Sequence, residues 1–135
     1  MPEEIRVAID GESDIVTARQ RGRDLAQTLG FGGVDLTLLS TAISEVARNI
    51  VKYAGRGEIL LWTDARGPEQ GIVVQARDQG PGIPDLELAM RDGYSTGKGL
   101  GLGLPGARRL MDEFDIQSAQ GKGTVVTLKK WAKAR

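Results

Sequence analysis

The spacing of apolar residues predicts a strand and two helices in the first half of the chain. Residues 5–9 alternate between apolar and more polar side chains, which is typical of a strand. A first helix is expected to begin at a Ser13 cap and to end before the glycines of 30–33. A second helix is expected over 35–54, because apolar residues recur there every three or four positions.

In the second half of the chain the sequence pattern predicts four strands, two before and two after a segment rich in glycine. The glycines and prolines of 79–84 argue against regular structure there, and a short helix is expected over 86–91. A third helix is expected to begin near 102–106 and to carry Leu110 and Met111. The expected strands are 58–65 and 71–78, joined as a hairpin by a turn at 66–69, and then 114–119 and 123–130.

These elements, with no internal repeat among them, predict a single domain over residues 1–135. Hydrophobic residues make up 40% of the chain and charged residues 27%, as in an ordinary soluble domain. Three main helices and about five strands favour an α/β (α+β) two-layer sandwich, in which helices cover one face of a mixed sheet.

Charge and hydropathy narrow the possible partners. The 18 Lys and Arg residues balance 18 Asp and Glu residues, so there is no basic excess of the kind that a nucleic-acid-binding domain usually shows. The N-terminal residues have no apolar signal-peptide core, and no apolar run is long enough to span a membrane. We therefore expect a cytoplasmic protein that binds neither nucleic acid nor membrane.

The chain contains no histidine and no cysteine, which excludes several kinds of chemistry. It has no thiol nucleophile, no disulfide, no Ser-His-Asp triad and no metal site built from His or Cys. Proton transfer by this chain must therefore use a carboxylate, lysine, tyrosine or water.

Glycine is about twice as frequent as usual, and six of the 19 glycines lie within 93–106. The segment 101–106 matches G-x-G-x-x-G, but a loop precedes it and the acidic residue required about 20 positions later is missing. The segment 93–99 resembles a P-loop, but it is one residue short and Lys98 precedes Gly, not Ser or Thr. We reject both motifs.

The second expected helix carries Glu45, Asn49 and Lys52 on one face, at positions i, i+4 and i+7. Such a face is most simply a solvated polar surface with an i,i+4 pair. It could also bring a carboxylate, an amide oxygen and a cation to one polyanion and its metal, since Mg²⁺ takes few protein oxygens in addition to phosphate.

Asp78, Gly80 and Gly82 directly follow an expected strand. They are consistent with a simple turn in which Asp bonds the backbone. They are also consistent with a carboxylate that accepts a hydrogen bond from an exocyclic amine, beside glycines that let a flat ring approach. The string Gly121-Lys-Gly-Thr124 is equally consistent with a plain hairpin turn.

Taken in order, four short motifs resemble the boxes of the GHKL ATPase superfamily, to which gyrase, Hsp90, histidine kinases and MutL belong. The motifs are Glu45-x-x-x-Asn49, Asp78-x-Gly80-x-Gly82, Gly97-x-Gly99-x-Gly101-x-Gly103 and Gly121-x-Gly123-Thr124. The resemblance implies a Bergerat-type ATP-binding fold, with ATP and Mg²⁺ as cofactors and a mobile lid formed by about 84–98.

The resemblance also implies roles for single residues. Asn49 matches the Mg²⁺ ligand, Glu45 the catalytic base that orients or deprotonates a hydroxyl, and Asp78 the acceptor of the adenine amine. The remaining matches are expected to bind the nucleotide: Lys52, Gly80, Gly82, Lys98, Gly99, Leu100, Gly101, Leu102, Gly103 and Thr124. Phosphate binding by the glycines at 99–103 has a physical reason, because the free backbone amides at a helix N-terminus attract phosphate. Pro105 is expected to lie in the first turn of the third helix, where proline is tolerated.

Within the superfamily, residues 44–54 resemble the RsbT family of switch serine/threonine-protein kinases, relatives of the anti-sigma factor kinases. This implies phosphorylation of STAS-domain partners in a stressosome pathway and possible activation of a PP2C-type phosphatase regulator. Three alternatives stay open. They are the ATP-binding domain of a histidine kinase, a nucleotide-gated binding switch and an anti-sigma kinase that sequesters its partner directly. A protein that only binds nucleotide does not need a carboxylate at position 45, where this chain has Glu45.

Overall fold

The computed structural model describes residues 4–82, 103–119 and 121–132. Each expected element within these ranges is present, whereas the helix expected over 86–91 lies outside them. In chain order the elements are β1 (Ile5–Ile9), α1 (Glu12–Thr28), α2 (Gly33–Ala54), β2 (Gly57–Arg66), β3 (Glu69–Asp78), α4 (Gly103–Leu110), β4 (Glu113–Ala119) and β5 (Gly123–Trp131).

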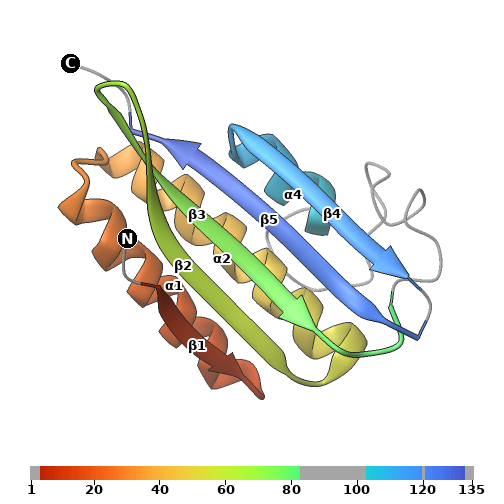
Figure 1. The fold of residues 1–135 in the computed structure, drawn as a ribbon. Coiled ribbons are helices and arrows are strands. Elements are labelled where there is room, and N and C mark those ends of the chain that lie inside the picture. The colour runs from red at the N-terminus through yellow and green to blue at the C-terminus, as the bar shows by residue number, and fades with distance from the viewer. Residues whose placement is uncertain (1–3, 83–102, 120, 133–135) are drawn as a thin grey trace.

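The five strands form one sheet in the order β1-β2-β3-β5-β4 (Figure 1). All four pairings are antiparallel, so the expectation of a mixed sheet is corrected. The connections explain the difference. Helices α1 and α2 form an antiparallel pair between β1 and β2, and β4, which runs parallel to β3, is separated from it by β5. The hydrophobic pattern predicts strands but does not fix their relative direction.

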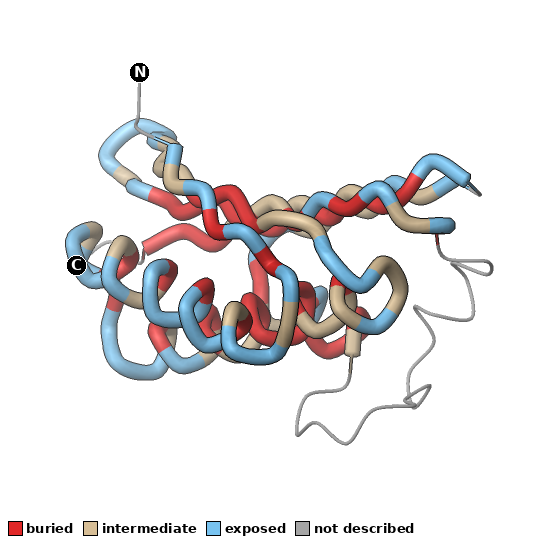
Figure 2. Tube along the Cα trace, turned by 90° about the horizontal axis from the view of Figure 1, so that it is seen from below, coloured by how far each residue is buried: buried red, intermediate tan, exposed pale blue. Residues whose placement is uncertain are grey.

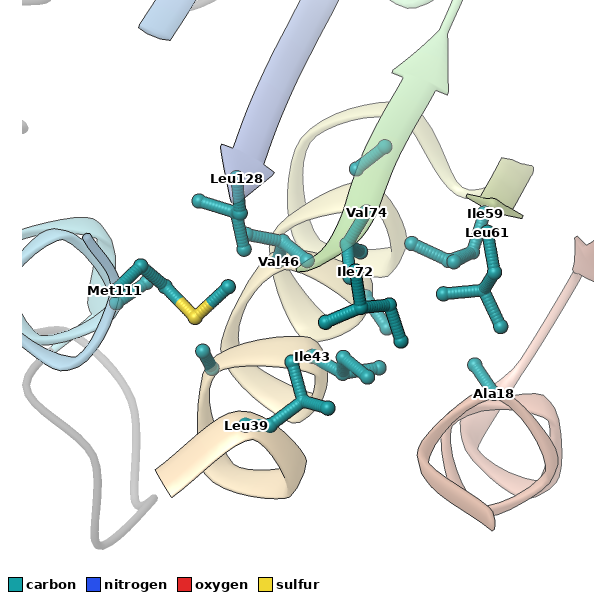
Figure 3. Packing of buried hydrophobic residues seen from close by; sticks show 14 of the residues in the cluster. Ala18, Leu39, Ile43, Val46, Ile59, Leu61, Ile72, Val74, Met111 and Leu128 are labelled. Carbon is teal, nitrogen blue, oxygen red and sulfur yellow. The ribbon is translucent and has the colours of Figure 1, made fainter. Parts of the chain in front are cut away.

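The helices α1, α2 and α4 cover one face of the sheet, which confirms the two-layer sandwich (Figures 1 and 2). Helix α2 lies at the centre and packs against α1 on one side and α4 on the other. Figure 3 shows Leu39, Ile43 and Val46 of α2 among side chains of the central strands and Met111. Ile43, Ile72, Val74 and Leu128 are fully buried.

In the part of the chain that the structure describes, no helix covers the other face of the sheet (Figure 2). The Lys129 ammonium lies 2.8 Å from a carboxylate oxygen of Asp64, and this hydrogen bond lowers the pKa of Asp64. The guanidinium of Arg66 lies 4.2 Å from the ring centroid of Trp131. None of the described helices is long and apolar enough to cross a membrane.

Two element ends differ from the expected ones. Helix α1 begins at Glu12 with Gly11 as its N-cap, so Ser13 lies inside the helix and does not cap it. The carboxylate of Asp14 instead accepts a hydrogen bond of 2.8 Å from the backbone N–H of Asp10. In the β2–β3 hairpin the strands extend to Arg66 and Glu69, leaving a two-residue turn whose Gly67 has a φ of 58°.

The close approach of α1 to α2 depends on Gly22, and this leads to a first prediction. A Cβ at Gly22 would overlap Cδ1 of Ile43, which is fully buried. Gly22→Ala should therefore destabilise the fold by up to about 2 kcal/mol, because an overpacking cost of roughly 1–3 kcal/mol is partly offset by the roughly 1 kcal/mol gained in helix propensity. Urea denaturation provides the measurement.

Ile43→Val supplies the matched test, because it removes only the atom that the new methyl group would meet. The double variant should recover part of the loss, which gives a favourable coupling in a double-mutant cycle. If the stability losses of the two single variants simply add, the methyl group introduced at position 22 does not clash with Cδ1 of Ile43. Gly33→Ala is the control, since a Cβ there meets no atom within 4 Å.

Candidate functional site

Asp78 is the last residue of β3, and it lies where three strands and a helix converge. It pairs with Gly57 of β2 on one side and with Thr124 of β5 on the other. Because side chains alternate along a strand, Asp78 faces the helix layer together with the buried residues Val74 and Ala76. Asp78 is only 8% exposed.

The carboxylate of Asp78 accepts hydrogen bonds from two backbone amides. The N–H of Gly80 donates to Oδ1 at 3.0 Å, and the N–H of Thr124 also donates to this carboxylate. Burial raises the pKa of Asp78 above its ordinary value, and these two donors partly offset the rise. The result is an oriented, buried hydrogen-bond acceptor at the edge of the helix layer.

Four glycines allow the backbone segments to approach one another around Asp78. A Cβ at Gly123 would overlap the carbonyl oxygen of Asp78, and one at Gly57 would lie 2.9 Å from Ile50 Cγ2. A Cβ at Gly80 would lie 2.6 Å from Cβ of Ala54, and one at Gly82 would lie 2.5 Å from the carbonyl oxygen of Ala119. These glycines are therefore required by packing within the chain, a reason that differs from the expected approach of a ligand ring.

Helix α2 carries the second group of expected site residues. Glu45 is 8% exposed, Asn49 is half-buried and Lys52 is exposed, so the face becomes more open toward the end of the helix. The Glu45 carboxylate lies 2.9 Å from Nη1 of Arg48, one turn further along. The Lys52 ammonium lies 5.1 Å from the ring centroid of Tyr53.

The two groups of residues are joined at the last turns of α2. Ile50, next to Asn49, lies against Gly57, the strand partner of Asp78. Gly80 lies against Ala54 at the end of the same helix. The structure thus places the acidic end of β3 beside the last turns of α2.

Helix α4, which packs against α2, begins at Gly103, within the expected range of 102–106. Gly103 has a φ of 69°, and Pro105 lies in the first turn, as predicted. Met111 lies beyond the helix and is buried. Five expected nucleotide-binding residues lie outside the described residues: Lys98, Gly99, Leu100, Gly101 and Leu102.

Two site residues were not anticipated from the sequence. Arg48 pairs with Glu45 at i,i+3, a spacing that can be read from the sequence. The hydroxyl of Ser118 in β4 lies 2.8 Å from the hydroxyl of Thr124, its partner across the β4–β5 hairpin. Counting strand register outward from the turn at 121 could have found this pair.

A hollow of about 400 Å³ borders Asp78. Glu45, Asn49 and Thr124 do not contribute to its lining, so it adds no support to a nucleotide pocket. Its lining residues are Arg56, Gly57, Glu58, Arg77, Asp78 and Gln79.

Comparison with known proteins agrees with this arrangement. Residues 34–134 match the family described as histidine kinase-, DNA gyrase B-, and HSP90-like ATPase. The chain is 54% identical over 125 residues to the serine/threonine-protein kinase RsbT of Bacillus subtilis, covering 93% of this chain and 94% of the relative. It is 32% identical over 102 residues to the anti-sigma F factor of Heyndrickxia coagulans, covering 71% and 69%.

Solved structures agree at the level of the fold. The crystal structure of the RsbU and RsbW domains of Rv1364c from Mycobacterium tuberculosis matches 98% of this chain and 33% of its own chain. The TM-score is 0.62 at 22% sequence identity. The mycobacterial sensor histidine kinase MprB matches the whole chain at a TM-score of 0.53 and 18% identity.

The raised pKa of Asp78 leads to a prediction about stability. Folding raises this pKa above its ordinary value of 3.8, so the folded state favours the protonated carboxyl. The unfolding free energy of the parent, relative to Asp78→Asn, should be highest below that value and should fall as pH rises through the raised pKa. Urea denaturation of both proteins from roughly pH 3 to 7 tests this. A relative stability that instead grows with pH would contradict the raised pKa.

The burial of Glu45 leads to a third prediction. Arg48→Met leaves its carboxylate without the neighbouring guanidinium and should cost about 1–3 kcal/mol of unfolding free energy. Arg6→Met is the matched control, because the Arg6–Glu58 pair is 3.4 Å apart and more exposed, at 64% and 29%. That control should cost less than about 1 kcal/mol. Equal losses in the two variants would mean that the Glu45–Arg48 pair does not stabilise the site.

Proposed function

Because the chain belongs to the histidine kinase-, DNA gyrase B-, and HSP90-like ATPases, we propose that it is an ATP- and Mg²⁺-dependent serine/threonine-protein kinase. The similarity to RsbT along almost the whole of both chains supports the kinase activity. The observation that carries the proposal is the buried Asp78 carboxylate, held by two backbone amides at the end of β3, close to the last turns of α2.

In this proposal Asp78 accepts a hydrogen bond from the exocyclic amine of adenine. Its two backbone donors fix the orientation of the carboxylate before any ligand binds. Thr124, only 3% exposed, pairs with Asp78 across the sheet and is proposed to support the base together with it. Gly80 and Gly82 shape the loop at its edge. Lys52, Lys98 and the amides of 99–103 are proposed to bind the phosphates.

The donor set of α2 fits a magnesium ion bound with phosphate. Asn49 is half-buried and offers one neutral amide oxygen, whereas Glu45 is held by Arg48. Mg²⁺ prefers one or two protein oxygens together with phosphates and water. Asn49 would therefore hold the ion, which supplies charge neutralisation for the triphosphate.

Glu45 is the proposed catalytic residue. In the reaction, the bond between the γ-phosphorus and the β–γ bridging oxygen breaks, and a serine or threonine oxygen forms a new bond to phosphorus. The hydroxyl proton passes to the Glu45 carboxylate, and ADP is the leaving group. Phosphoryl transfer depends mainly on positioning and charge neutralisation, which suits a chain without histidine or cysteine.

The proposed substrates are STAS-domain proteins, as the resemblance to the RsbT family implies, within a cytoplasmic stressosome pathway. A PP2C-type phosphatase regulator is the proposed second partner of the released kinase. Similarity to anti-sigma F factors supports an alternative, in which the chain sequesters its partner directly. That similarity is lower and covers a smaller share of both chains than the similarity to RsbT.

Glu45→Ala separates a kinase from a nucleotide-gated binding switch. Since a base acts mainly in the transition state, ATP affinity should stay within a few-fold of the parent. Phosphoryl transfer from labelled ATP to a STAS-domain serine should fall by roughly 10²–10⁴. A late departure of the hydroxyl proton would make the loss smaller. Single-turnover phosphorylation beside an ATP titration measures both quantities.

Glu69→Ala is the matched control, because this carboxylate lies in the β2–β3 hairpin and pairs only with Arg66 among the ion pairs described. Its transfer rate should equal that of the parent. Undiminished transfer by Glu45→Ala would remove Glu45 from the mechanism. A parent protein that binds ATP but transfers phosphate to no STAS partner would favour the binding switch.

A further inference from the structure

Arg48 is the partner of the proposed catalytic carboxylate and the more exposed member of the pair. Its Nη1 lies 2.9 Å from a carboxylate oxygen of Glu45, and the two side chains are 38% and 8% exposed. Among the described residues, Glu45 is the one hydrogen-bonding or ionic partner of the Arg48 side chain. An arginine carries several N–H donors in a planar fork, so the bond to Glu45 leaves others that can bind a further group.

Helical geometry places Arg48 and Asn49 on opposite sides of Glu45. All three residues belong to α2, which is continuous over Gly33–Ala54. With about 3.6 residues per turn, the residue four positions after Glu45 lies about 40° to one side of it, and the residue three positions after lies about 60° to the other. Glu45 is therefore flanked by the proposed metal ligand on one side and by a guanidinium on the other.

The direction of phosphoryl transfer gives these two sides different roles. The attacking oxygen and the leaving oxygen of ADP are roughly in line through the γ-phosphorus, so nucleotide and protein substrate approach from opposite directions. In the proposed reaction the triphosphate lies on the Asn49 side, which leaves the Arg48 side to the incoming serine or threonine. The acceptor hydroxyl must come within hydrogen-bond distance of Glu45. The residues that flank the acceptor, with Cα atoms about 3.8 Å from its own, then fall within reach of Arg48.

We propose that Arg48 selects the protein substrate: its guanidinium binds a carboxylate beside the phosphoacceptor hydroxyl, so that the kinase prefers a serine or threonine with acidic neighbours and disfavours one with basic neighbours. A carboxylate fits because it can accept two parallel N–H bonds from a guanidinium, whereas an ammonium is repelled. This inference rests on the proposed function, since it takes Glu45 to be the base. Arg48 is a specificity-determining residue, and the hydroxyl proton still passes to Glu45.

The test uses a STAS-domain protein whose phosphoacceptor has been mapped by mass spectrometry after reaction with the parent kinase. This substrate is prepared with both residues that flank the acceptor changed to Glu, to Gln or to Lys. For the parent, the second-order rate constant of transfer should fall in the order Glu, Gln, Lys, by roughly tenfold from first to last, because an attraction is replaced by a repulsion. The spread should narrow at high salt, which screens exposed charges.

Variants of Arg48 assign the preference to this side chain. Arg48→Met should give nearly equal rate constants for the three substrates, and a comparison within one variant cancels any general loss of activity. Arg48→Gln serves the same purpose if Arg48→Met does not fold, and Arg48→Lys keeps the charge and should keep the order. Arg6→Met is the control, because Arg6 pairs with Glu58 on neighbouring strands and its loss should leave the full spread. Substrate affinities measured by calorimetry without nucleotide should follow the same order in the parent and become equal in Arg48→Met.

The outcomes separate this inference from the proposed function. Equal rate constants for the three substrates in the parent would overturn the inference and leave the kinase activity standing. So would an Arg48→Met variant that is slower with all three substrates but keeps the parent's spread, because Arg48 would then act on the phosphates or on Glu45 alone. A parent that transfers phosphate to no STAS-domain protein would overturn both. The order Glu, Gln, Lys in the parent and in Arg6→Met, with its loss in Arg48→Met, is the result that supports the inference.

Discussion

The structure around the candidate site depends on one steric constraint, the absence of side chains at four glycines near Asp78. Gly57, Gly80, Gly82 and Gly123 each lie so close to neighbouring atoms that a Cβ would overlap them or press against them. Because these residues have no Cβ atom, β2, β5 and the end of α2 can pack closely around the end of β3. Two of them, Gly82 and Gly123, also have φ values of 85° and 83°, which other residues rarely adopt.

This close packing places two carboxylates of the chain in contrasting surroundings. Burial raises the pKa of Asp78, and among the described residues two oriented backbone amides stabilise its charged form. Glu45, equally shielded from solvent, has the guanidinium of Arg48 at 2.9 Å. In the proposed kinase, the first carboxylate recognises a base and the second orients a hydroxyl. Each role matches the partners that the fold provides.

Much of the fold could be predicted from the sequence because each main element has a clear apolar period or a glycine boundary. The positions of α2, β3 and β5 were predicted to within a few residues, and the site motifs lie on them as expected. The antiparallel direction of all strands was not predicted, because the apolar pattern of a strand is the same in either direction. The start of α1 was wrong because Asp14 bonds back to Asp10, whereas Ser13 is part of the helix.

The candidate site residues came from the sequence, whereas the packing around them did not. Glu45, Asn49 and Asp78 were singled out by the resemblance of their ordered motifs to the superfamily, and their proposed roles stay predictions. The packing of Gly57 against Ile50 and of Gly123 against Asp78 requires tertiary contacts that no local pattern contains. Ser118 was missed because its contact with Thr124 depends on strand register.

The central claim, that ATP binds where the backbone amides hold Asp78, can be tested directly by NMR. In a titration of the ¹⁵N-labelled protein with Mg·ATP, the backbone amide signals of Gly80 and Thr124 should shift and saturate together. The indole N–H of Trp131, which donates to Glu113 on the open face of the sheet, should stay unchanged. Saturating shifts at Trp131 with no change at Gly80 and Thr124 would place the nucleotide elsewhere and contradict the account.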